Sequence, residues 1–192
     1  MTDLSTSRPQ SGLSRNRGWS YLTALGPVIA SSIMTAFAVA VPGGEFTLIM
    51  IAVFGWLLSL CAWVAFLAIG RLRRRRVLVL VPPLLAAVTF ALATFGIPMR
   101  AAFLISEAPL TDYANALPEQ AQWSQNNGRA GLFTLDSARR WQGVTQLYIS
   151  GSGGFLTKCG FAHAPDGHTK DIDVSTIDHV TSNWYVFCTD FD

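Results

Sequence analysis

Residues 71–76 read Arg-Leu-Arg-Arg-Arg-Arg, and this cluster lies between two stretches without any charged side chain. Residues 46–70 precede it, residues 77–99 follow it, and a third uncharged stretch covers residues 18–44. As helices, the three would be about 40, 37 and 34 Å long in chain order at ~1.5 Å per residue, and a bilayer core of ~30 Å needs about 20 apolar residues. Each stretch can therefore cross a membrane once.

The composition also argues against an ordinary soluble domain. Only 14% of the 192 residues are charged, against about 25% in soluble domains. The alternative, three buried helices of a soluble protein, would need a core too large for so short a chain. Residues 1–100 are basic and residues 101–192 are acidic. Opposite charge in the two halves indicates two environments rather than one basic nucleic-acid surface, so no nucleic-acid partner is expected.

The arginine cluster also predicts the orientation, because short cytoplasmic loops hold the excess of Lys and Arg. The first connection, Pro-Gly-Gly-Glu at 42–45, has no base, whereas the N-terminal tail has three arginines. We therefore expect a multi-pass protein of the cell membrane with a cytoplasmic N-terminus and an extracytoplasmic C-terminal domain. The predicted topology anchor consists of Arg71, Arg73, Arg74, Arg75 and Arg76.

These boundaries predict three regions. They are a cytoplasmic tail (1–18), a three-span region (19–100, with spans at about 20–41, 46–70 and 77–97) and an extracytoplasmic domain (101–192). Ala38-Val39-Ala40 resembles a signal-peptide cleavage site, but the preceding apolar stretch of ~20 residues exceeds the usual 7 to 15 and favours a retained span. Cleavage would leave the position of the C-terminal domain unchanged.

The predicted spans hold hydroxyl groups but no ionisable group. Hydroxyls can bond back to carbonyls of their own helix, whereas transport usually needs ionisable groups at membrane depth. Anchoring is therefore the favoured role, with a non-conducting subunit of a transport complex as an alternative. Ser32, Ala36 and Ala40 share one helix face, which can pack the spans on one another or receive a partner membrane protein.

The C-terminal region has the pattern of a small α+β domain. Apolar spacing predicts an amphipathic helix over 107–117, preceded by Ser106 and ended by Pro118. Alternating residues predict strands at 131–135, 144–149, 155–162 and 184–189, and a weaker one at 177–181. The predicted fold class is membrane all-α with three transmembrane helices, followed by an α+β domain in which an antiparallel meander carries one helix.

Two cysteines fall in the predicted strands of this domain. Cys159 and Cys188 each share a strand face with aromatic residues. Outside the cytoplasm they could form a disulfide that closes about 30 residues and contributes about 3 to 4 kcal/mol. Two buried thiols are the alternative.

A possible metal site lies in residues 163–173. His163, His168, Asp166, Asp171 and Asp173 are donor types that cations use. Their spacing matches no known metal motif, however, and a Pro-Asp-Gly turn is first of all a solvated loop. We keep His163, His168, Asp171 and Asp173 as candidate metal ligands and predict no cofactor and no catalytic residue.

Some residue runs resemble a group of uncharacterised small membrane proteins of high-GC Gram-positive bacteria. The resemblance covers residues 77–192. The runs that carry it are Arg-Ala-Ala-Phe at 100–103 with Ser106, Gly-Leu-Phe at 131–133, Gly-Ser-Gly-Gly-Phe at 151–155, Gly-Phe-Ala-His-Ala-Pro-Asp-Gly at 160–167 and Trp-Tyr-Val-Phe at 184–187. It implies no known activity, so no functional residue follows from it.

The sequence thus favours a membrane-anchored extracytoplasmic protein of the cell envelope that acts as an accessory or interaction subunit without catalysis. The lipid bilayer is its expected partner. An envelope enzyme or metal-binding protein that uses the His/Asp loop at 163–173 is the alternative.

Overall fold

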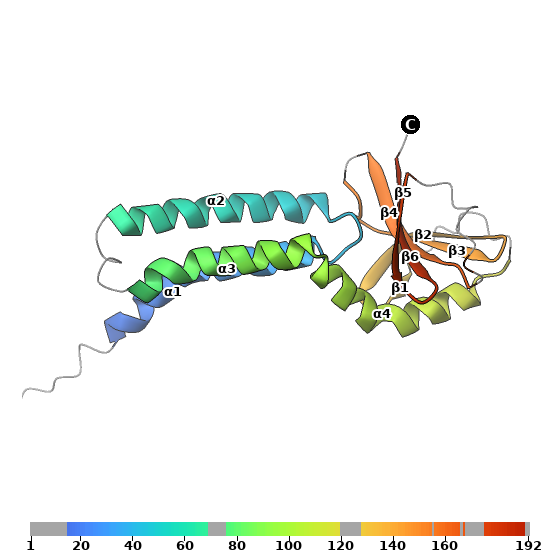
Figure 1. Cartoon of the computed structure of the whole chain (residues 1–192), viewed down its shortest axis with the longest axis horizontal. Coiled ribbons are helices and arrows are strands. Elements are labelled where there is room, and N and C mark those ends of the chain that lie inside the picture. The colour runs from blue at the N-terminus through green and yellow to red at the C-terminus, as the bar shows by residue number, and fades with distance from the viewer. Residues whose placement is uncertain are drawn as a thin grey trace, which may run out of the picture.

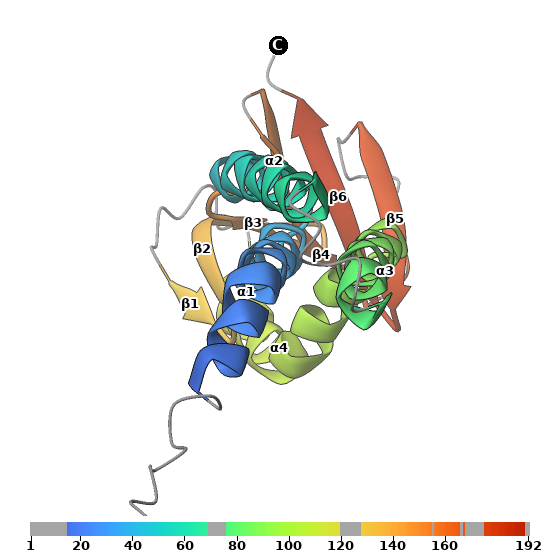
Figure 2. The same ribbon diagram turned by 90° about the vertical axis from the view of Figure 1, so that its left-hand side faces the viewer.

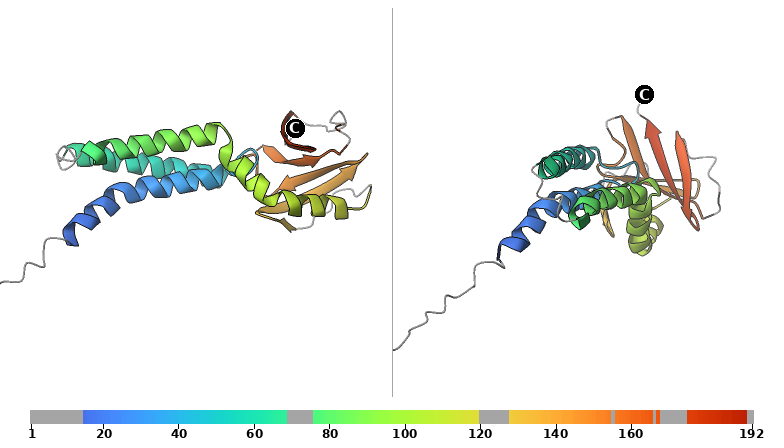
Figure 3. Two further views of the ribbon diagram at one scale, coloured as in Figure 1. Left: turned by 60° about the horizontal axis from the view of Figure 1, so that its bottom comes forward. Right: turned by 60° about the vertical axis from the view of Figure 1, so that its left-hand side comes forward.

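The computed structural model describes residues 15–68, 76–119, 128–154, 156–165, 167 and 175–190. In this part of the chain, three helices lie side by side as a long rod and one antiparallel sheet sits at the end of the rod (Figure 1). They are α1 (Arg15–Ala38), α2 (Phe46–Ala68) and α3 (Arg76–Thr94). A fourth helix, α4 (Ile97–Ala116), leaves the rod and runs along the sheet (Figure 3).

The length and composition of the helices support fewer membrane crossings than the sequence predicts. Among the described residues, α2 alone is long and apolar enough to cross a bilayer by itself. The pair α3 and α4, bent by 56°, would count as a second crossing if it formed one broken span. The described apolar part of α1, Leu25–Ala38, is a shorter helix.

Hydroxyl groups of the rod bond to their own helices, as the sequence predicts. Ser31 donates to the Pro27 carbonyl (2.8 Å), Ser59 to the Gly55 carbonyl (2.8 Å) and Thr89 to the Leu85 carbonyl (2.8 Å). Each bond gives the hydroxyl hydrogen an acceptor within its own helix. These polar side chains therefore cost little inside an apolar bundle.

Helix α1 lies between α2 and α3 and packs on both (Figure 2). On the α2 side, Gly55 leaves room for Ser31, whose Oγ would lie 2.7 Å from a Cβ at position 55. Ser31 Oγ also lies 3.4 Å from Ser59 Oγ. On the α3 side, Thr89 Oγ1 lies 3.0 Å from Ser32 Oγ. Small residues thus let the helices approach closely, as in membrane bundles.

The residues of the predicted face, Ser32, Ala36 and Ala40, have different neighbours within the chain. Ser32 bonds to α3, Ala36 is exposed, and Ala40 packs against the core of the sheet. The helix contacts use neighbouring positions, chiefly Ser31 and Thr35, because the α1–α2 interface lies one residue away from the predicted face.

Helix α4 differs from the predicted helix at 107–117. It begins ten residues earlier, after Gly96, whose positive φ of 64° breaks the path of α3 and is a conformation that glycine adopts without strain. Pro98 follows in the first turn, where a missing N–H costs least. Ser106 is not a cap but is fully buried, and its hydroxyl accepts a hydrogen bond from the Leu132 N–H (2.9 Å). The predicted end before Pro118 is correct.

The sheet contains six antiparallel strands in the order β1-β2-β3-β4-β6-β5. They are β1 (Arg129–Ala130), β2 (Phe133–Trp141), β3 (Val144–Ile149), β4 (Thr157–His163), β5 (Thr176–Thr181) and β6 (Trp184–Asp190). The predicted simple meander is wrong at its end, because β6 pairs with β4 and β5 lies at the edge. The prediction also missed the second half of β2, where the register shifts between Leu135 and Ser137 and interrupts the alternation.

The main core lies between α4 and one face of the sheet. Phe103 and Leu110 of α4 are fully buried against Phe161 of β4 and Trp184 of β6. The ring centroids of Phe103 and Phe161 are 5.0 Å apart, and those of Phe133 and Phe161 are 5.1 Å apart. A smaller apolar cluster, with Phe187 and Tyr148, lies on the other face. The helix is therefore part of the folded domain rather than a linker to it.

Candidate functional site at the junction of rod and sheet

The connection between α1 and α2 is bound directly to the sheet. The Gly153 N–H donates to the Gly44 carbonyl (3.0 Å), and Glu45 forms an isolated antiparallel bridge with Ser152. Residues 42–45, the connection without a basic residue, thus meet the glycine-rich turn between β3 and β4. The sheet is attached to the rod at this junction as well as through α4.

A disulfide between Cys159 and Cys188 lies at the same junction. The two residues face each other on β4 and β6, with a Cα–Cα distance of 4.1 Å. The cysteine pair predicted from the sequence is therefore present at disulfide distance. Gly43 packs on the Cys159 sulfur so closely that a Cβ at position 43 would overlap it. The α1–α2 connection consequently rests on the disulfide itself.

Ser152 holds the glycine-rich turn against β4. Its buried side chain donates to the Ile149 carbonyl (2.6 Å) and accepts from the Cys159 N–H (3.2 Å). A strand, and no helix, follows the turn. The turn therefore lacks the helix N-terminus that a phosphate cradle uses, and its role here is to position the strand that carries Cys159.

A polar cleft of about 440 Å³ opens beside this junction. Its wall contains Glu45 from the start of α2, the Asp136–Lys158 ion pair (2.9 Å), and the hydroxyls of Thr47, Ser150 and Thr157. Thr157 also lies 3.2 Å from Asp190. No histidine or cysteine is among the described residues that line the cleft. This set of groups can hydrogen-bond a polar ligand.

Of the predicted metal ligands, only His163 is among the described residues. His168, Asp171 and Asp173 lie outside them, as do Asp166, Arg71, Arg73, Arg74 and Arg75. Arg76 is the first residue of α3. No group of three or more His, Cys, Asp or Glu side chains in the described part of the chain is arranged to hold a metal ion.

His163 occupies a partly buried place at the end of β4. Its ring packs on Trp184, with 4.7 Å between ring centroids. Burial lowers the pKa of His163, and the nearby Arg140 guanidinium lowers it further. Arg140 in turn donates to the Leu117 carbonyl (2.9 Å) at the end of α4. A fixed positive charge beside the imidazole opposes both its protonation and a bound cation.

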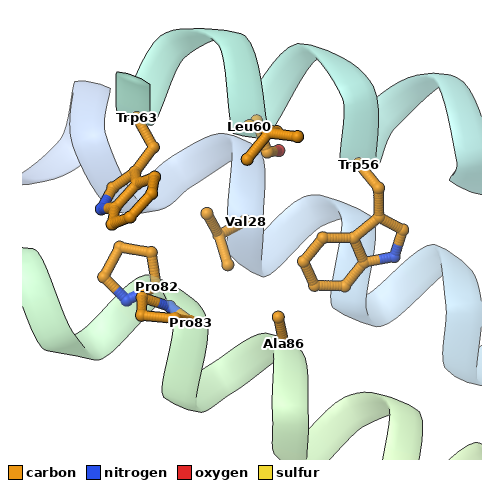
Figure 4. Close-up of a pocket in the computed structure, with 8 residues that line it drawn as sticks. Val28, Trp56, Leu60, Trp63, Pro82, Pro83 and Ala86 are labelled. Carbon is orange, nitrogen blue, oxygen red and sulfur yellow. The ribbon is translucent and has the colours of Figure 1, made fainter. Parts of the chain in front are cut away.

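A second feature, an apolar groove, runs along the rod between α2 and α3. Two cavities of about 230 and 560 Å³ form it and share Trp56 and Leu60 in their walls. In the first, Trp56, Leu60 and Trp63 of α2 face Pro82, Pro83 and Ala86 of α3, and Val28 of α1 lies between them (Figure 4). Trp56 donates to Thr35 Oγ1 (2.9 Å), whereas the Trp63 N–H is buried without a partner among the described residues.

Sequence reasoning found part of this arrangement. It identified both cysteines, but not their contact with residues 42–45, which are far away along the chain. The groove was missed as well, although two tryptophans within a predicted span were a signal for it. No known protein family, curated protein or solved structure matches this chain.

Proposed function

We propose that this chain is an integral membrane protein that crosses the bilayer with α1, α2 and α3 and holds its disulfide-bonded sheet outside the cytoplasm. The supporting observation is the exposure of the rod: only 11% of the most apolar stretch of α2 is buried. A core helix of a soluble protein would bury most of such a stretch. Large apolar side chains on all three helices are exposed, among them Ile33, Phe37, Phe54, Leu58, Leu80, Leu84 and Phe90.

Charge and redox chemistry support one orientation. The arginines at 71–76 follow α2 and lead into α3, whose first residue lies at the end of the rod away from the sheet (Figure 1). Arginine-rich loops stay in the cytoplasm, and disulfides persist outside it. Both rules place the sheet on the same, extracytoplasmic side.

Labelling in intact cells tests this topology. In a Cys61→Ala background, we expect a membrane-impermeant maleimide to react with an Asp178→Cys variant, because position 178 is exposed on the edge strand β5. The matched variant Leu72→Cys, within the arginine cluster, should react only after the cells are permeabilised. Labelling of position 72 but not of position 178 in intact cells would reverse the proposed orientation.

We further propose that the protein is an accessory or interaction subunit of an envelope assembly, with the groove between α2 and α3 as the place of a partner's transmembrane helix. From Ile49 to Trp63 the groove follows about 21 Å of α2 at ~1.5 Å per residue. One leaflet offers only about 15 Å of hydrocarbon, half of the ~30 Å core. A helix matches this length better than one lipid tail, and Ala86 and Ala93 on the α3 wall allow close approach.

Filling the groove tests this partner role. We expect the double variant Ala86→Leu with Ala93→Leu to lose its partner in purification from its host in mild detergent, since overpacking costs about 1 to 3 kcal/mol, which is roughly five- to 150-fold in affinity. The control is Ala87→Leu with Ala91→Leu on the same helix, where both alanines are exposed outside the groove. Equal recovery of the partner with both variants would contradict the groove as the binding site.

A further inference from the structure

We propose that the outer face of the first half of α4 binds the lipid surface, within the headgroup layer of the outer leaflet. This inference rests on the proposed membrane topology, and it concerns a part of the chain outside the three spans. With this contact, the sheet domain lies directly on the membrane surface, whereas the three spans alone would only tether it above the membrane.

The bend between α3 and α4 sets the depth of this face. Because α4 leaves the axis of α3 at 56°, each residue advances only about 0.8 Å along that axis rather than ~1.5 Å. Leu104 and Ile105 are then about 6 to 7 Å beyond Ile97, at the end of α3. The headgroup layer on each side of the hydrocarbon is roughly 5 to 8 Å thick. Both side chains are therefore within or at the edge of this layer.

The two faces of this part of α4 have different neighbours. Ala102, Phe103 and Ser106 are buried against the sheet domain. On the outer face, Leu104 is 62% and Ile105 is 69% exposed. In water, two adjacent large aliphatic side chains in this position would leave their apolar surface hydrated. In an interfacial helix, such side chains enter the boundary between headgroups and acyl chains.

The apolar face is continuous with the lipid-facing surface of the rod. Phe95, in the break between α3 and α4, is 71% exposed, and Ile97 is 45% exposed. No polar residue with a large side chain interrupts the outer face between them and Ile105, except Arg100. The surface that we assign to lipid on α3 thus extends along α4, with Arg100 as its one large polar side chain before Ile105.

Arg100 supplies charge complementarity to lipid phosphates. It is exposed on the first turns of α4, and residues 95–106 contain no acidic side chain. A guanidinium at this depth can reach phosphate oxygens while its methylene groups lie along apolar surface. The acidic residues of α4 come later, at Glu107 and Asp112, where the helix has moved farther from the hydrocarbon. The charge order along α4 therefore follows the expected depth.

Spin-label accessibility tests the proposal with the full chain. Single cysteines at Leu104 and Ile105, in a Cys61→Ala background, are labelled under non-reducing conditions and reconstituted in vesicles of phosphatidylethanolamine and phosphatidylglycerol. Asn115→Cys is the matched control on the same helix, because its side chain is exposed but about 15 Å beyond Ile97. Leu58→Cys, exposed on α2, reports on the rod.

We expect the labels at positions 104 and 105 to collide severalfold less with a water-soluble nickel chelate than the label at 115, and to remain accessible to oxygen. Nickel accessibility equal to that of position 115 would overturn the inference, and so would protection from both reagents, since a protein rather than lipid would then cover α4. If position 58 is also open to nickel, the proposed membrane topology fails. Lipid exposure at 58 with water exposure at 104 refutes the α4 inference alone.

Discussion

A Phe103→Ala variant is expected to lower the free energy of unfolding of the sheet domain by about 3 to 5 kcal/mol. Phe103 is fully buried, and its ring lies 5.0 Å from that of Phe161 and 5.6 Å from that of Trp184. It thereby joins α4 to two neighbouring strands, β4 and β6. Truncation removes the aromatic contacts and leaves a cavity in the centre of the core.

Amide hydrogen exchange of β4, in the full chain in mild detergent, measures this loss as a lower free energy of opening. The matched control is Leu104→Ala, the next residue of α4, whose side chain points away from the core and is largely exposed. In detergent we expect it to change the free energy of opening by no more than about 0.5 kcal/mol. Similar effects of the two variants would contradict the packing of α4 on the sheet.

Removal of the disulfide should cost nearly as much. For the double variant Cys159→Ala with Cys188→Ala, we expect a free energy of unfolding about 3 to 4 kcal/mol lower, because the bridge closes a segment with a sequence separation of 29. Alanine is preferred to serine at position 159, where the side chain is buried. The opening of β4 and β6 amides by hydrogen exchange measures this change too.

Reductant provides the control for this second prediction. A reducing agent should destabilise the unmodified protein to the level of the double variant and leave the double variant itself unchanged. Cys61→Ala, within α2, should behave like the unmodified protein because Cys61 is exposed and unpaired. If reductant destabilised the double variant as much as the unmodified protein, the measured change would not come from loss of this disulfide.

The local patterns of the sheet were readable because its strands alternate. Predicted strands at 144–149 and 184–189 agree with β3 and β6 to within a residue. The order of the last two strands could not be predicted from the sequence. A meander with the order β4-β5-β6 and the observed order β4-β6-β5 place the same side chains on the same faces of the sheet. The pairing of β6 with β4 is set by long-range contacts, including Cys159 with Cys188.

The start of α4 was missed because its first turns are apolar on both faces. Phe103 faces the sheet and Leu104 faces outward, so the residues after Gly96 show no amphipathic period. The order of the three helices in the rod could not be predicted for the same reason. Largely apolar helices have no polar face that would indicate which of them lies in the middle. Only contacts such as Trp56 with Thr35 identify the neighbours of α1. The metal ligands predicted at His168, Asp171 and Asp173 remain a prediction.

The contact of Gly43 and Gly44 with the glycine-rich turn and Cys159 has a consequence for biogenesis. In the proposed topology, the connection between α1 and α2 is exported early in synthesis, long before the ribosome has made β3 and β4. It has no contact with the sheet until the C-terminal strands are exported and their cysteines are oxidised. The junction is thus the last part of the molecule to assemble, and a chain halted before export of its carboxyl-terminal third would present this loop to the quality-control proteases of the envelope.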